Sequence, residues 1–159
     1  MNTKDNFFYG LEGSNLFKIY VSDVALHGAK VGTNVYNEQT ARAMTMHFGL
    51  IGYFIGKSMA KKAVQKRADN EAKYDAFEPG SPPFREGDKA NFSLAGSDVQ
   101  SAVLTPKPTG LKGAFSGGPM LELQLAGGKK RKFLLIENQN LPFIKNLIAR
   151  PIPMATLSE

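Results

Sequence analysis

The chain has 159 residues, of which 42% are hydrophobic and 21% charged, and this composition suits one globular domain over 1–159 rather than a disordered segment. It contains no cysteine, which excludes disulfides, thiolate metal sites and cysteine nucleophiles and fits a reducing compartment. The N-terminus has no basic stretch followed by a long apolar run, so we expect a cytoplasmic protein, with membrane association as an alternative.

The formal net charge of +6 is concentrated in two clusters, one within 57–67 and one within 129–132. Such clusters raise the local concentration of anionic partners, for example lipid headgroups. Nucleic acid is a weaker expectation and at most a nonspecific one, because the basic residues are not interleaved with exposed aromatic residues. The alternative is two ordinary solvated surfaces. The candidate contacts to an anionic partner are Lys57, Lys61, Lys62, Lys66, Arg67, Lys130 and Lys132.

The first predicted elements are two strands, 16–21 and 24–31, joined by the turn residues Ser22 and Asp23. The run 16–21 is rich in aromatic and β-branched residues, which favour strands. We therefore expect this pair to form the first hairpin of the chain.

A long helix is predicted over about 38–76. Asn37 can cap its first turn, and the proline-rich run 79–83 cannot continue it. An unbroken helix of this length would span roughly 60 Å, longer than a small domain, so we expect a break or a projecting arm.

Strands resume over 89–95 and 98–105, followed by a glycine-rich loop over 106–118 whose role the sequence leaves open. Alternating leucines over 121–125 then predict a half-buried strand, which pairs across a glycine turn with a strand that carries Phe133 and Leu135. We expect a three-residue loop, Gly127-Gly128-Lys129, which places Leu123 opposite Phe133 and Leu121 opposite Leu135.

The last predicted element is a short helix that begins after Asn140 and ends before Pro151. Its apolar face should lie across an open end or face of the sheet, where unburied apolar surface remains. The residues of that face are Leu141, Ile144, Leu147 and Ile148.

These elements predict an α+β fold: a strongly bent antiparallel sheet, or partly open β-barrel, with a C-terminal helix and a long inserted helix. The strand order, the phrase over 96–103, the hairpin over 121–133 and the terminal helix together resemble a bacterial pleckstrin-homology-like domain. The resemblance covers 16–32 and 89–150 and is interrupted by the helix of 38–76. Some members of that family bind phosphoinositides through basic residues of the first hairpin loop, but the loop expected here, 21–24, has none, so that site is not carried over.

The inserted helix carries a stripe of small residues beside a stripe of large apolar ones, and it is apolar nearly all round between 43 and 56. A small barrel covers one side only, and small residues permit close approach of a second helix. We expect homo-oligomeric contact through this stripe, whereas the lipid interface and the chain's own surface are the alternatives. Its uncharged run rises roughly 21 Å, too short to cross a bilayer. The candidate self-association residues are Gly49, Gly52, Gly56, Ala60 and Ala63.

Catalysis is not expected, and neither a cofactor nor a metal nor a small-molecule substrate is indicated. Gly56-Lys57-Ser58 resembles the end of a phosphate-binding loop, but that motif requires glycine where Ile51 stands. His27 and His47 have no second ligand at metal-binding spacing. The sequence therefore favours a noncatalytic binding and assembly module, with a peripheral membrane protein that uses helix 43–63 as the alternative.

Overall fold

The computed structural model describes residues 5–33, 61–106, 118–136 and 139–157. Eight strands form one sheet in the order β4-β3-β2-β1-β7-β6-β5-β8. All neighbours are antiparallel except β5 and β8, which are parallel. The strands are β1 (Phe7–Glu12), β2 (Asn15–Val21), β3 (Ala25–Thr33), β4 (Phe92–Ala95), β5 (Val99–Thr105), β6 (Met120–Leu125), β7 (Lys130–Leu135) and β8 (Ala155–Leu157).

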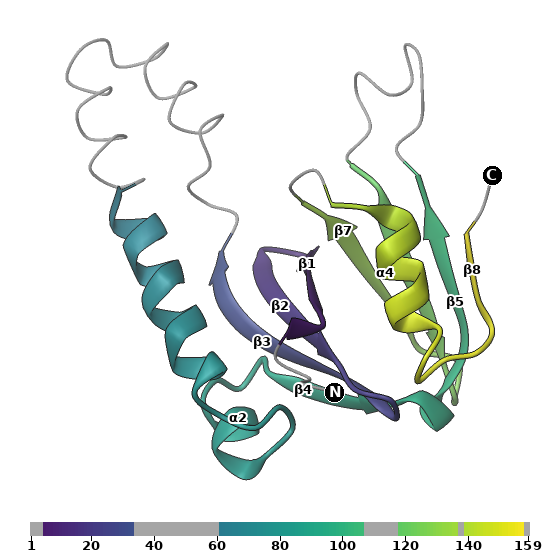
Figure 1. Cartoon of the computed structure of the whole chain (residues 1–159), viewed down its shortest axis with the longest axis horizontal. Helices are drawn as coiled ribbons and strands as arrows, with labels where there is room; N and C mark the ends of the chain where they lie inside the picture. Colours follow the sequence, from purple (N-terminus) through teal and green to yellow (C-terminus); the bar gives the residue numbers. More distant parts are fainter. Residues whose placement is uncertain (1–4, 34–60, 107–117, 137–138, 158–159) are drawn as a thin grey trace, which may run out of the picture.

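Helices lie on both sides of this sheet (Figure 1). They include α2 (Pro82–Glu86), the short 3-10 helix η3 (Gly96–Asp98) and α4 (Leu141–Ile148). A further helix covers the described residues 61–75. The predicted α+β class and C-terminal helix are therefore confirmed, and the sheet is open rather than closed into a barrel, with β4 and β8 as its edges.

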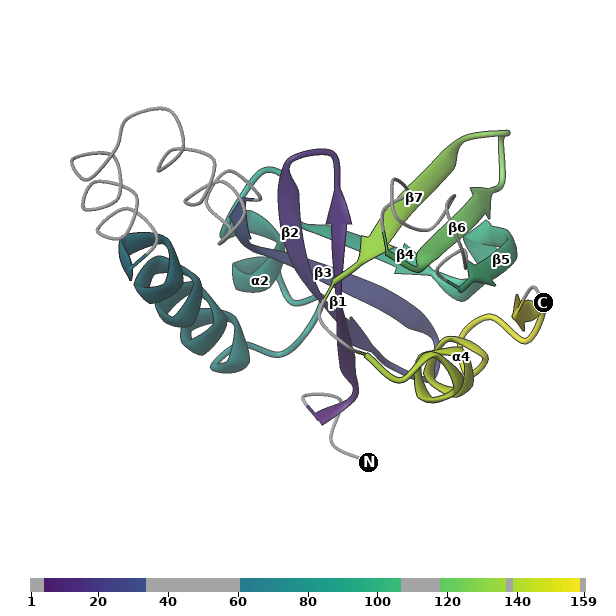
Figure 2. The same cartoon turned by 90° about the horizontal axis from the view of Figure 1, so that it is seen from above.

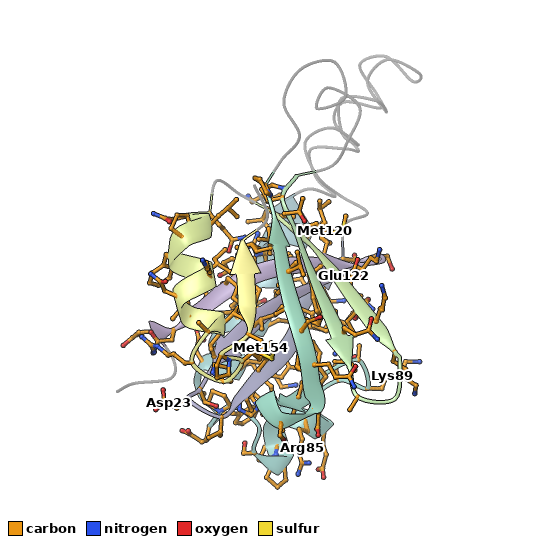
Figure 3. All side chains as sticks on the ribbon, turned by 90° about the vertical axis from the view of Figure 1, so that its right-hand side faces the viewer. Asp23, Arg85, Lys89, Met120, Glu122 and Met154 are labelled. Atoms are coloured by element: carbon orange, nitrogen blue, oxygen red, sulfur yellow. The ribbon has the colours of Figure 1, made fainter. Side chains whose placement is uncertain are left out.

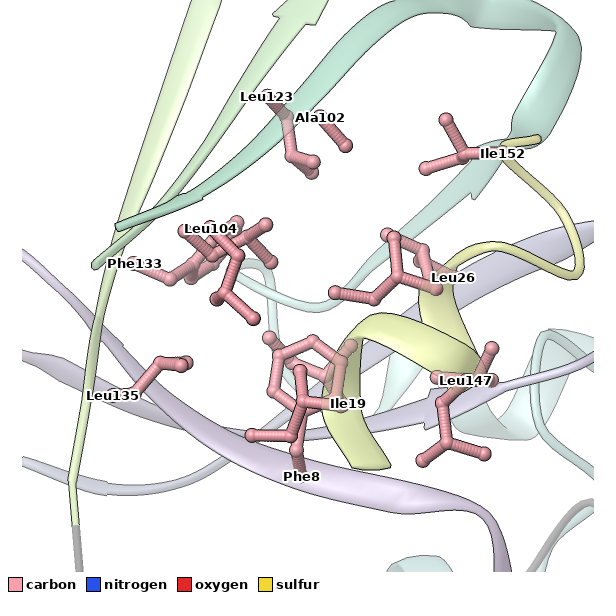
Figure 4. Close-up of a cluster of buried hydrophobic side chains, with 14 of the residues drawn as sticks. Phe8, Ile19, Leu26, Ala102, Leu104, Leu123, Phe133, Leu135, Leu147 and Ile152 are labelled. Carbon is pink, nitrogen blue, oxygen red and sulfur yellow. The ribbon is translucent and has the colours of Figure 1, made fainter. Parts of the chain in front are cut away.

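The main core lies between the two halves of the sheet, β1–β4 and β5–β8, with α4 packed over it (Figure 4). Phe8, Ile19 and Leu26 come from the first half, and Leu104 and Phe133 from the second. The α4 helix begins as predicted, because the Asn140 side chain accepts a hydrogen bond from the Phe143 amide. All four residues of its expected apolar face pack in this core.

The first hairpin of the chain is β1–β2, one strand earlier than predicted. A tight turn at Gly13, whose φ is +61°, allows Glu12 and Asn15 to pair. The predicted pair 16–21 and 24–31 exists as β2–β3, but it is the second hairpin. The true first loop also lacks a basic residue.

Hairpin β6–β7 has the predicted loop length but not the predicted register. Leu121 pairs with Phe133, and Leu123 pairs with Arg131. The loop is Ala126-Gly127-Gly128, because both glycines have positive φ and the Leu125 amide donates to the Lys129 carbonyl. The shift is two residues, so the leucines keep their core face, and Arg131, which shares that face with Phe133, lies opposite Leu123 rather than Leu125.

Arg131 lies on the core-facing side of β7 and contacts two other strands, and we call this set of contacts the Arg131 clamp. Its Nε donates to Oε1 of Glu12 on β1 over 2.8 Å, and Nη2 donates to the other carboxylate oxygen. The guanidinium also lies 3.7 Å from the ring centroid of Phe92 on β4. One side chain of β7 thus contacts strands from both ends of the first half of the sheet.

Candidate functional site

The 61–75 helix covers the face of β1–β3 that is opposite α4 (Figure 2). A stripe at helical spacing faces the sheet and is half-buried or buried: Ala63, Arg67, Asn70, Glu71 and Tyr74. Asn70 donates from Nδ2 to the Val31 carbonyl over 3.1 Å. The helix ends near residue 76 as predicted, and α2 follows because Pro82 and Pro83 are tolerated in a first helical turn.

The outer face of the sheet carries a second apolar cluster, separate from the main core. Tyr74 of the helix is 2% exposed and Phe84 of α2 is fully buried against this face. Their rings contact each other edge to face at 5.4 Å between centroids. The buried sheet residues of the cluster are Leu11, Leu16, Tyr20, Ala29 and Val31.

An ion pair between a buried lysine and a half-exposed aspartate holds the end of the helix on this face. Lys18 of β2 is 4% exposed, and its Nζ lies 2.7 Å and 3.0 Å from the two carboxylate oxygens of Asp75. The Tyr20 hydroxyl donates to the same carboxylate over 2.6 Å. The ammonium also lies 4.1 Å from the ring centroid of Phe7. Burial, followed by the contact with Asp75, raises the pKa of Tyr20.

A second polar cluster, centred on Glu71, lies about one helical turn from Asp75. Glu71 accepts hydrogen bonds from the Tyr9 hydroxyl over 2.9 Å and from Nε of Arg67 over 2.6 Å. The Arg67 guanidinium lies 4.6 Å from the Tyr9 ring centroid. Burial and the Glu71 carboxylate raise the pKa of Tyr9 to about 12. Arg67, a candidate contact to an anionic partner, is thus engaged within the chain.

The opposite face of the helix is exposed and basic. Lys61, Lys62 and Lys66 lie on it and are all exposed, as is Lys73 nearer the sheet-bound end. Asp69 is also exposed and lies beside Lys62, Lys66 and Lys73 at helical spacing, so one carboxylate reduces the positive charge of this surface. Val64, which is 68% exposed, lies on the other flank of the helix. We call the four lysines the basic helix face. One helix therefore binds its own sheet with one side and presents positive charge with the other.

The other lysine cluster surrounds a carboxylate. Lys130 and Lys132 of β7 lie 3.0 Å and 2.8 Å from the two oxygens of Glu122 on β6 (Figure 3). Hydrogen bonds from Lys132 and Lys130 lower the pKa of Glu122. Both lysine side chains are more than half exposed, so they remain accessible. The charge of this cluster is nevertheless partly neutralised.

His27 lies on β3 as predicted and contacts Ser93 of β4 through Nδ1. Burial lowers its pKa, opposed by the charge of Glu78. Within the described part of the chain, no carboxylate hydrogen-bonds this ring, and no group of three or more acidic, histidine or cysteine side chains could hold a metal.

Several predicted site residues lie outside the described residues. Among the self-association candidates, only Ala63 is described, and it lies on the stripe that faces the sheet. The undescribed candidates are Gly49, Gly52, Gly56, Ala60 and Lys57, and His47 and most of the loop over 106–118 are undescribed too. Over the described ranges, no helix is both long and apolar enough to cross a membrane.

Lys18 and Asp75 are absent from the sequence-predicted site. Lys18 stands within the apolar run 16–21, and Asp75 is 57 positions further along the chain. The one available signal was a single lysine inside a strand with no other charged residue.

Comparison of the chain with protein-family models, with curated proteins and with solved structures gave no match.

Proposed function

We propose that this protein is a noncatalytic binding module that engages an anionic lipid surface through the basic helix face. The observation that carries the proposal is the division of charge on the 61–75 helix. Arg67 and Lys18 pair with Glu71 and Asp75 on the sheet side, whereas the four lysines face solvent. Basic residues near an anionic leaflet contribute roughly 1 kcal/mol each.

A pleckstrin-homology-like fold is part of this proposal. The support is the sheet order β4-β3-β2-β1-β7-β6-β5. Each half of the sheet is a meander, and the two halves meet where β1 pairs with β7. The helix α4 follows β7 in the chain. The helix of 61–75 would be an insertion between β3 and β4. The phosphoinositide site of the family is not proposed here, since the β1–β2 loop has no basic residue.

The test compares vesicles of anionic and neutral lipid in a co-sedimentation assay. We expect binding to the anionic vesicles alone, and we expect Lys62→Gln with Lys66→Gln to weaken it by about 25-fold, which is about fivefold for each lost charge. The matched control is Lys130→Gln with Lys132→Gln, which removes the same charge from lysines already paired with Glu122 and should have a smaller effect. Equal binding to neutral vesicles, or equal effects of the two double variants, would contradict the proposal. Tighter binding to duplex DNA than to vesicles would instead identify nucleic acid as the partner.

Self-association through Gly49, Gly52, Gly56 and Ala60 remains a second part of the proposal, and Ala63 is left out of it because it faces the chain's own sheet. Its support is the stripe of small residues in the sequence. Sedimentation equilibrium should give a mass above that of the monomer, and Gly52→Leu with Gly56→Leu should return the monomer mass. An unchanged mass would exclude association through this stripe.

A further inference from the structure

Lys18 is the one cation on the outer face of β2 that solvent hardly reaches. With 4% of its surface exposed beneath the helix, it cannot itself touch a lipid surface. Its ammonium is held by Asp75 and lies 4.1 Å and 5.2 Å from the ring centroids of Phe7 and Tyr20. Any effect of Lys18 on binding must therefore act through the helix.

Glu71 and Asp75 are the two acidic residues that the helix directs toward the sheet, and their negative charges are paired with different cations. Glu71 is paired with Arg67 on the same helix, so that pair persists whether or not the helix contacts the sheet. Asp75 is paired with Lys18 of the sheet, so its neutralisation requires docking. Asp75 is 43% exposed and also accepts a hydrogen bond from the Tyr20 hydroxyl, so loss of Lys18 would not leave a buried bare charge, but it would remove the ion pair that favours the docked position.

Docking also orients the basic helix face. The contacts that fix the helix are concentrated at its C-terminal half, at Asn70, Glu71, Tyr74 and Asp75. In the first turns of its described part, only Ala63 and Arg67 are shielded from solvent. The direction in which Lys61, Lys62 and Lys66 point therefore depends on how firmly this C-terminal half is held.

We infer that Lys18 is a positioning residue for the basic helix face, and that docking of the helix and binding of an anionic surface strengthen each other. This inference rests on the proposed function and names its regulation. Because coupling between two equilibria is reciprocal, a surface that binds only the docked, oriented helix must also stabilise docking.

The test compares two variants that each lose one lysine paired with an aspartate. In Lys18→Met, the new side chain can pack against Phe7 and Tyr20, but Asp75 loses the cation that pairs with it. In Lys30→Met, the lost lysine comes from the opposite face of β3, where it lies 3.8 Å from Asp88. Both variants have the same net charge. We expect Lys18→Met to weaken binding to anionic vesicles by about fivefold and Lys30→Met by less than about twofold.

A double variant then separates positioning from direct contact of Lys18 with lipid, since the effect of net charge is controlled by Lys30→Met. Lys18→Met with Asp75→Asn has the net charge of the original protein, and the new amide oxygen can still accept a hydrogen bond from the Tyr20 hydroxyl. We expect its vesicle binding to return to within about twofold of the original. If Lys18 contacted lipid directly, the double variant would stay weak, and the inference would be wrong.

Hydrogen exchange gives an independent readout of docking. Amides of the 61–75 helix should exchange faster in Lys18→Met while those of β5–β7 stay protected, and anionic vesicles should slow exchange of this helix in the original protein. Loss of protection throughout Lys18→Met would mean that the pair supports the whole fold, and it would overturn the inference, as would vesicle binding that Lys18→Met leaves unchanged. Absence of vesicle binding by the original protein would refute the proposed function itself.

Discussion

The Arg131 clamp offers a sharp test of how the open sheet is held together. We consider Arg131→Met, which keeps an unbranched apolar stem but removes the guanidinium. Two charge-assisted hydrogen bonds to Glu12 contribute about 1.5–3 kcal/mol, and the contact with the Phe92 ring adds about 0.5–1 kcal/mol. The sum is roughly 2–4 kcal/mol, and it needs no large reduction for solvent screening because the Arg131 and Glu12 side chains are only 19% and 32% exposed. For a chain of this length we expect the thermal midpoint to fall by roughly 6–12 °C.

The adjacent residue of the same strand provides the control. Lys132 points to the other face, is 57% exposed and pairs with Glu122 at the surface. Lys132→Met removes the same charge, yet the midpoint should barely move, because exposed ion pairs contribute little. Differential scanning calorimetry of the two variants checks the comparison. Equal shifts, or an unchanged midpoint in Arg131→Met, would refute the assignment of a clamp.

Two further predictions concern backbone packing and pH. In Gly96→Ala the new Cβ would lie 1.8 Å from the Pro151 carbonyl oxygen, so urea unfolding should show that the free energy of unfolding falls by about 2–3 kcal/mol. The control is Gly32→Ala, whose Cβ has no neighbour closer than 3.7 Å and which should be neutral or slightly stabilising. The pKa of Tyr9 is about 12 in the folded chain, whereas a tyrosine of the unfolded chain ionises near pH 10. The free energy of unfolding should therefore fall as the pH rises above about 10. Denaturation experiments should show a shallower fall for Tyr9→Phe.

The sequence predicted those elements whose signals are local. The apolar runs of β2 and β3, the leucine alternation of β6 and the cap at Asn140 each act within a few residues, and all four elements form. Strand β1 was missed, although its aromatic run and the turn at Gly13 could have indicated it. The three residues of β8 are too few to give a pattern, and they form a strand because β5 lies beside them.

The candidate site was predictable only on its exposed side. Lysines on a helix are visible in the sequence, and Lys61, Lys62 and Lys66 are indeed exposed. Which face the helix turns to the sheet depends on Tyr74, Asp75 and their partners on strands more than fifty positions away. The sequence gives no distance between such residues, so neither the engagement of Arg67 nor the role of Lys18 could be derived from it.

Strand β2 is enclosed on both sides, with α4 and the second half of the sheet on one and the 61–75 helix on the other. Six of its seven residues are buried, so neither face of the strand is available for polar substitution. A shortened protein that lacked the segment between β3 and β4 would expose Leu16 and Tyr20 to water and would be expected to aggregate. The 61–75 helix and α2 therefore form a structural layer of the domain, and engineering of the basic helix face must leave the sheet-facing residues of this helix in place.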